Sequence, residues 1–179
     1  GELDSSRLWV INTAVDPSEP DAEPAEVPAL WLTGRRPIAI SVSPDSTCLA
    51  AISTDDGGGD VQIQVSGIAR QPNGLPTSTA TQSLQVAASV EQARDLTWIT
   101  PTTLGVLGRR STDKAVRPLV VEVGGQIEAL AAVTSARSIA TTGGERELYV
   151  TTSSGRTYSR VGASWSALGV TGSVVVPSS

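Results

Sequence analysis

The chain of 179 residues has no histidine, phenylalanine or methionine, a single lysine beside twelve arginines, and one cysteine. Without histidine it lacks the commonest general base and metal ligand of proteins, which disfavours hydrolytic and metal-dependent chemistry. One cysteine, Cys48, excludes an intrachain disulfide, and its strand-like surroundings predict a small, buried apolar residue. No run of about 18 apolar residues is present, so the sequence predicts no transmembrane helix.

The net charge of −5 is unevenly distributed. Five acidic residues occupy one stretch that contains no basic residue: Asp16, Glu19, Asp21, Glu23 and Glu26. The rest of the chain is neutral, with 13 basic and 13 acidic residues. Because no run of basic residues stands out, the sequence gives no electrostatic support for binding nucleic acid or an anionic membrane surface.

Alternation of apolar and polar residues is the main structural signal. It is clearest in Ile38–Ser43 and Val61–Val65, while 119–123 and 148–152 are rich in β-branched residues. Turn formers such as Gly57-Gly58-Gly59 separate these runs. The best helical candidate, Val86–Arg94, has no convincing period of 3.6 residues. The sequence therefore predicts an all-β chain.

An internal repeat divides this chain into four-stranded units. The units are expected at residues 35–92, 93–135 and 136–179, with Leu49, Leu104 and Leu148 in equivalent places. The expected strands are Ile38–Ser43, Cys48–Ser53, Val61–Arg70 and Ser83–Ala87; Arg94–Thr100, Thr103–Leu107, Pro118–Val123 and Gln126–Leu130; Arg137–Thr141, Glu147–Thr152, Arg156–Val161 and Trp165–Leu168. Four-stranded units of about 40–50 residues are typical of β-propeller blades, so we expect about three and a half blades of a larger propeller.

Residues 1–34 match only the second half of such a unit. Ser6–Val10 and Trp31–Gly34 are expected as its third and fourth strands, joined by the acidic, proline-rich loop 16–28. The inner strands of that blade are then expected further upstream. The last apolar run, Ser173–Val176, is expected either to close the ring or to remain without a partner strand.

Several motifs carry weak functional signals. Ser43-Pro44-Asp45-Ser46 resembles the Ser-Pro-Asp-Gly turn of Tol-associated propellers, with serine in place of glycine. The acidic loop 55–60 lacks the alternate ligand spacing of a calcium site, so we expect a solvated hairpin loop. Glu145 and Glu147 could pair for glycoside hydrolysis, but surface charge is the better interpretation. We assign no catalytic, cofactor-binding or metal-binding residue, and the partner-binding residues are unknown.

The four tryptophans have different expected places. Trp98 lies inside a strand and is predicted to be part of the core. Trp9, Trp31 and Trp165 lie near strand starts or in outer strands, where tryptophan often packs one blade against the next. Any of these three could instead mark a partner surface.

Several segments, taken in their order along the chain, also resemble a known family. These segments are Ile40–Asp45, Val65–Arg70 with Gly74-Leu75-Pro76, Asp95–Trp98 with Thr103–Gly108, Leu148–Thr152 with Gly155, and Trp165. Together they are similar to the C-terminal β-propeller of the LpqB family of actinobacterial lipoproteins. The tail at 175–178 departs from the family's usual ending, at the place of the expected closing strand.

The resemblance implies a lipoprotein that is lipid-anchored on the extracytoplasmic face of the cell membrane. The family is associated with the MtrB-MtrA two-component system, so the implied partner is the extracytoplasmic domain of an MtrB-like sensor histidine kinase. We therefore expect a non-catalytic protein-interaction module that modulates this kinase in envelope and division control. The alternative is a propeller that binds or degrades a cell-wall saccharide or peptide. No cofactor and no nucleic acid are expected.

Overall fold

The computed structural model describes residues 8–10, 24–27, 29–72, 74–84, 90–130, 133–142, 147–162 and 164–171. Within these ranges the chain is all-β apart from the one-turn 3-10 helix η2 (Leu30–Leu32). No helix in the described part is long and apolar enough to cross a membrane. Several predicted features lie outside these ranges: Ser173–Val176, Asn73, the turn at 143–144, Glu145, the acidic residues of 16–23, and 86–89 of the helical candidate.

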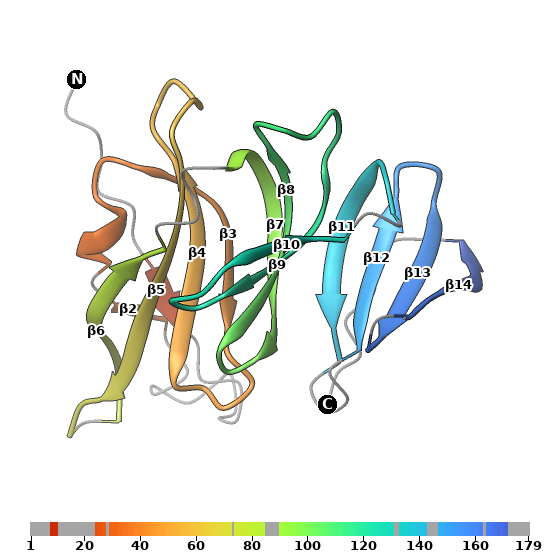
Figure 1. Ribbon diagram of the computed structural model, residues 1–179. Coiled ribbons are helices and arrows are strands. Elements are labelled where there is room, and N and C mark those ends of the chain that lie inside the picture. The colour runs from red at the N-terminus through yellow and green to blue at the C-terminus, as the bar shows by residue number, and fades with distance from the viewer. Residues whose placement is uncertain are drawn as a thin grey trace.

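The described residues form three antiparallel sheets of four strands each and one two-stranded sheet (Figure 1). The first sheet contains β3 (Arg36–Val42), β4 (Cys48–Thr54), β5 (Val61–Arg70) and β6 (Pro76–Ser83). The second contains β7 (Val90–Thr100), β8 (Thr103–Arg110), β9 (Arg117–Glu122) and β10 (Ile127–Ala129). The third contains β11 (Ala136–Thr141), β12 (Leu148–Thr152), β13 (Arg156–Val161) and β14 (Ser164–Thr171). In each sheet the strands lie side by side in chain order, so each repeat is a meander.

The predicted all-β fold is confirmed, and most inner strands lie where the sequence placed them. The prediction for the fourth strand of the first unit is wrong. It was expected at Ser83–Ala87, but the strand is β6 at Pro76–Ser83, which is mostly exposed. An outer strand needs no buried apolar face, and proline is tolerated at its first residue, so the apolar pattern did not mark it. Residues 90–94 of the helical candidate belong to β7.

The N-terminal region also differs from the prediction. β1 (Leu8–Val10) pairs with β2 (Ala25–Val27), so the segment 16–28 is not a loop throughout. Trp31 and Leu32, expected in a fourth strand, form the helix η2 instead. This turn directs Leu32 against Ala51 of the first sheet, where both are completely buried. At this point the chain therefore buries Leu32 against the first sheet, in place of the backbone hydrogen bonds that a fourth strand would have made.

The apolar core lies between the sheets. One cluster joins the first and second sheets and includes Ile52, Ile63, Trp98 and Leu104. A second cluster joins the second and third sheets through Leu107, Val116, Ile139, Leu148 and Val150, among others. Because each strand alternates its side chains, β8 directs Leu104 to one neighbouring sheet and Leu107 to the other.

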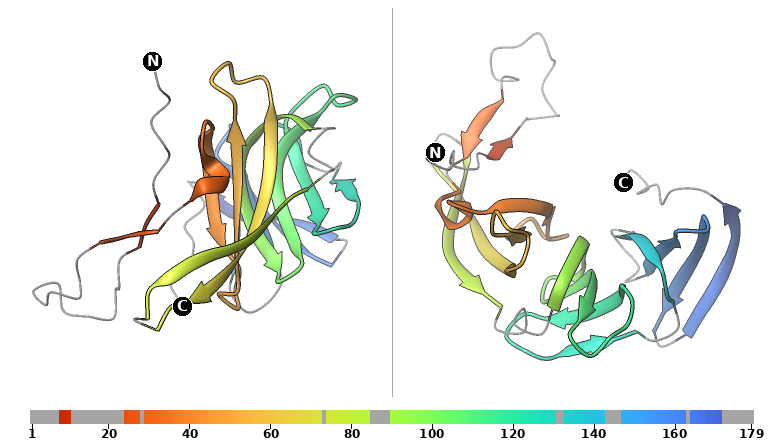
Figure 2. Two further views of the ribbon diagram at one scale, coloured as in Figure 1. Left: turned by 90° about the vertical axis from the view of Figure 1, so that its left-hand side faces the viewer. Right: turned by 90° about the horizontal axis from the view of Figure 1, so that it is seen from above.

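The sheets follow one another along an arc (Figure 2, right), and the inner strands β3, β7 and β11 all run downward in the view of Figure 1. β3, β7 and β11 lie next to one another in the stack. Two rims result. The turn rim contains the turns inside the hairpins β3–β4, β5–β6, β7–β8, β9–β10 and β13–β14, and the opposite rim contains the β4–β5, β8–β9 and β12–β13 loops. The three loops of this opposite rim lie together at the top of Figure 1.

Candidate functional site

The Ser43-Pro44-Asp45-Ser46 turn sits at the end of β3 on the turn rim. Asp45 Oδ1 accepts hydrogen bonds from Ser43 Oγ at 2.6 Å and from Thr47 Oγ1 at 2.9 Å. Ser43 Oγ in turn accepts the backbone N–H of Cys48 at 2.9 Å. These bonds, led by the one from Ser43, hold the pKa of Asp45 below its ordinary value. The polar groups of the turn thus bond to one another and fix its shape.

Ser46 takes the place that glycine holds in the turn it resembles. Its φ of 57° lies in the left-handed region. A side chain there is strained, because Cβ approaches the following carbonyl oxygen. The serine therefore keeps the geometry of a glycine turn at an energetic cost.

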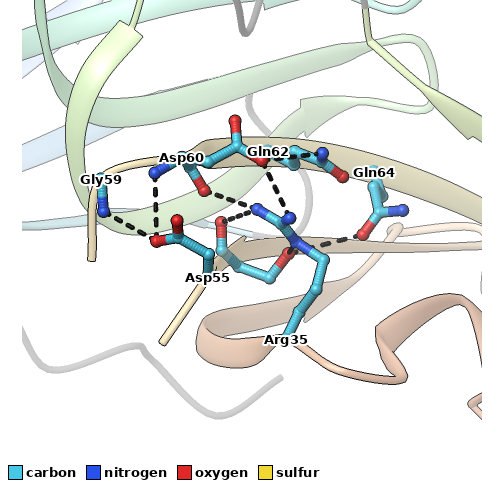
Figure 3. Close-up of polar contacts among 7 residues, drawn as sticks. Arg35, Asp55, Gly59, Asp60, Gln62 and Gln64 are labelled. Carbon is cyan, nitrogen blue, oxygen red and sulfur yellow. Dashed lines mark hydrogen bonds and ion pairs between the residues drawn. The ribbon is translucent and has the colours of Figure 1, made fainter. Parts of the chain in front are cut away.

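Arg35 connects the entry to β3 with the β4–β5 hairpin (Figure 3). Its Nη1 pairs with Asp60 Oδ2 at 2.9 Å, and its Nε donates to Ser53 Oγ at 2.9 Å. Nη2 donates to the backbone oxygens of Ser53 and Asp60. Gln62 Nε2 donates to the same Asp60 oxygen at 3.1 Å. These bonds of the guanidinium hold the hairpin loop against the start of the first sheet.

The acidic loop at 55–60 matches the predicted hairpin loop. Asp55 Oδ1 accepts the backbone N–H groups of Gly59 at 2.8 Å and Asp60 at 3.2 Å, and these bonds hold its pKa below the ordinary value. With Asp60 paired to Arg35, two of the three carboxylates are engaged. Among the described residues no group of three potential metal ligands is found.

Polar bonds also join the inner strands of the second and third sheets. Asp95 Oδ2 accepts the backbone N–H of Ile139 at 3.0 Å, while its Oδ1 accepts that of Leu96 at 2.9 Å. Thr141 Oγ1 donates to the carbonyl of Trp98 at 2.7 Å. Burial of the Asp95 carboxyl raises its pKa above the ordinary value despite the two N–H donors. Asp95 is thus a half-buried acid whose hydrogen bond from Ile139 joins the second sheet to the third.

The remaining predicted residues are separated in the structure. Glu147 Oε2 accepts the hydroxyl of Tyr149 at 2.7 Å. Trp98 is 2% exposed, which confirms it as core, and Trp165 is half-buried against the cluster between the second and third sheets. Trp31 is half-buried beside Leu32, whereas Trp9 is 56% exposed. Cys48 is half-buried in β4 rather than fully buried, because it lies at the first residue of the strand.

The fold assembles two surface features that the linear sequence does not reveal. At the turn rim, Leu75 and Val161 are exposed by 40% and 62%, and they come from the first and third sheets. At the opposite rim, basic side chains of the second and third sheets gather from four separate segments. We call this set the basic rim: Arg94, Lys114, Arg117, Arg137 and Arg156. These residues are far apart in the sequence, and the antiparallel strands bring them to one end of the second and third sheets.

Repeated four-stranded meanders that pack face to face along an arc define the chain as a β-propeller protein. A family model described as the lipoprotein LpqB β-propeller domain matches residues 6–178. The chain therefore belongs to the LpqB β-propeller family, as the resemblance predicted. A comparison with curated proteins finds no match.

Proposed function

We propose that this propeller is a non-catalytic interaction module of a lipid-anchored protein on the extracytoplasmic face of the membrane. Membership of a lipoprotein family supports the location. In this proposal its partner is the extracytoplasmic domain of an MtrB-like sensor histidine kinase, whose signalling it modulates. The single observation that carries the proposal is the turn rim, where the rigid sheets expose the apolar residues Leu75 and Val161.

The physical argument begins with rigidity. The sheets are joined by buried apolar clusters and by the bonds of Asp95 and Trp98 between neighbouring inner strands. A rigid scaffold that presents loops at its rims can hold a binding surface in a fixed shape. Leu75 and Val161 are exposed apolar side chains at this rim, and each offers an apolar contact to a partner that spans the rim.

A propeller that hydrolyses a wall saccharide would need two carboxylates at suitable separation. The described inner strands carry two acidic residues, and both are engaged. Glu91 pairs with Arg109 at 2.9 Å, and Asp95 accepts two backbone N–H groups. This arrangement favours the interaction module over the saccharide-degrading alternative.

Calorimetry between the chain and the purified extracytoplasmic domain of the kinase tests the proposal. We expect saturable binding that weakens at least tenfold, or about 1.4 kcal/mol, in the double variant Leu75→Ser, Val161→Ser. The matched control is the double variant Trp9→Ser, Leu30→Ser, which removes exposed apolar side chains away from the turn rim. No binding by the parent chain would overturn the proposed partner. Equal weakening in both variants would overturn the turn rim as the contact surface.

A further inference from the structure

The basic rim carries positive charge that the described structure does not neutralise. Arg94, Lys114, Arg137 and Arg156 are exposed, and none of them forms an ion pair with a described residue. On the second sheet the nearby acids Glu91 and Asp113 are paired with Arg109 and with Arg110 at 2.8 Å. The acidic β4–β5 loop at the same end belongs to the first sheet, where Asp60 pairs with Arg35 and Asp56 is exposed. The connecting residues 85–89 and 131–132 contain no charged residue. A chain with a net charge of −5 therefore keeps a local surface of the opposite sign.

The placement of these side chains follows the repeat. Arg94 and Arg137 occupy equivalent positions in β7 and β11, each at a register shift of the inner strand. Arg117 and Arg156 are the first residues of the third strands, β9 and β13. Arg117 has a buried Nε that lacks a hydrogen-bond partner in the described structure, so its guanidinium is only partly satisfied. Each of these charges can meet a separate anionic group, because an extended surface contacts them all at once.

The chemistry of this rim fits a lipid surface better than a protein partner. Protein interfaces depend on apolar and aromatic anchors at their centre. In the described part of the chain, the exposed large apolar residues all lie elsewhere: Trp9, Leu30, Ile40, Val42, Leu75 and Val161. Clusters of lysine and arginine bind anionic lipid headgroups without any apolar insertion. A lipoprotein domain is also held close to headgroups.

We propose that the basic rim docks on an anionic phospholipid membrane surface. The phosphate groups of the lipids face the exposed side chains of Arg94, Lys114, Arg137 and Arg156. Because the turn rim is at the other end of the strands, docking directs Leu75 and Val161 away from the membrane. The inference depends on the charge arrangement and the lipoprotein family, and not on which protein partner is bound.

Vesicle co-sedimentation of the unacylated 179-residue chain tests this inference. One set of vesicles contains equal parts of phosphatidylglycerol and phosphatidylcholine, and the other contains phosphatidylcholine alone. We expect binding to the anionic vesicles only, with a partition constant that falls as salt is raised. Each basic residue near the surface contributes about fivefold. The double variant Arg137→Gln, Arg156→Gln is therefore expected to bind about twentyfold more weakly.

The matched control is the double variant Arg70→Gln, Arg160→Gln. Both residues lie at the turn-rim ends of their strands, β5 and β13, and the change in net charge is the same. We expect less than a threefold effect, with far-UV circular dichroism confirming that every variant is folded. Equal loss in the two double variants, or equal binding to both vesicle types, would overturn the proposal. Absence of vesicle binding together with binding to polyglutamate would also overturn it, in favour of an acidic polypeptide partner.

Discussion

Replacement of Trp98 by phenylalanine tests how the first two sheets are held together. Trp98 extends from β7 into the cluster between these sheets, and its Nε1–H donates to the backbone oxygen of Ser41 in β3 at 2.9 Å. Phenylalanine keeps an apolar ring but leaves that carbonyl without its donor, which costs about 1–3 kcal/mol when the group is buried. The smaller ring leaves a cavity that adds about 1 kcal/mol. We expect a total loss of about 2–4 kcal/mol in the free energy of unfolding.

The assay is urea unfolding followed by far-UV circular dichroism, because the substitution itself changes tryptophan fluorescence. A loss of this size lowers Tm by about 5–15 °C in a chain of this length. The control is Trp9→Phe, since Trp9 is mostly exposed in β1 and its replacement should change stability by less than about 0.5 kcal/mol. If Trp98→Phe is no more destabilising than Trp9→Phe, the bond to Ser41 does not stabilise the stack and the reasoning is refuted.

Three further changes test other parts of the structure. A Cβ at Gly105 would lie 3.1 Å from the Cδ1 atoms of both Ile139 and Leu148, so Gly105→Ala should cost about 1–3 kcal/mol in urea unfolding. Gly169→Ala, with open space around it, should be nearly neutral, and equal effects would contradict the packing argument. Ser46→Gly should raise the free energy of unfolding by about 0.5–1 kcal/mol because it relieves a positive φ, and a loss would argue against strain. Burial raises the folded-state pKa of Asp95 above its ordinary 3.8, so ionisation of Asp95 destabilises the folded chain. This destabilisation is absent below about pH 3.8 and grows as pH rises through the folded-state pKa. Unfolding at a series of pH values should show Asp95→Asn gaining stability relative to the parent chain between about pH 4 and 7, and a constant difference would exclude this account.

The strands predicted from alternation are those that are buried. The predicted bounds are correct for two strands, Val61–Arg70 and Arg156–Val161. Side chains of these strands pack against neighbours, and apolar residues mark the buried positions in the sequence. β6 was misplaced because Ser and Thr fill a strand that mostly faces solvent. η2 was misread as a strand because a short apolar run such as Leu30–Leu32 suits either conformation. The periodicity of apolar residues thus predicts which residues are buried. It predicts the secondary structure only where every second residue of a strand is buried.

The candidate surfaces were harder to predict for a different reason. The basic rim contains residues as distant as Arg94 and Arg156, separated by most of two repeats. They meet only because β7 and β11 run in the same direction and their sheets pack face to face. A run of basic residues would have been visible in the sequence. A patch made of single residues at equivalent repeat positions becomes visible only after the repeats are aligned, and Arg94 and Arg137 are the pair that such an alignment could have found.

The same alignment identifies which exposed apolar residues belong to the stack itself. By strand register, Ile40 corresponds to Leu96 and Ile139, and these two are buried because each contacts the preceding sheet. Val42 corresponds to Trp98 in the same way, yet Ile40 and Val42 are 39% and 51% exposed. Propeller blades bury this face against a neighbouring blade. Ile40 and Val42 therefore have the character of a blade-packing surface, and their exposure is not evidence for a partner site. Leu75 and Val161, which lie at hairpin turns, have no such role in the stack and are the better test of partner binding.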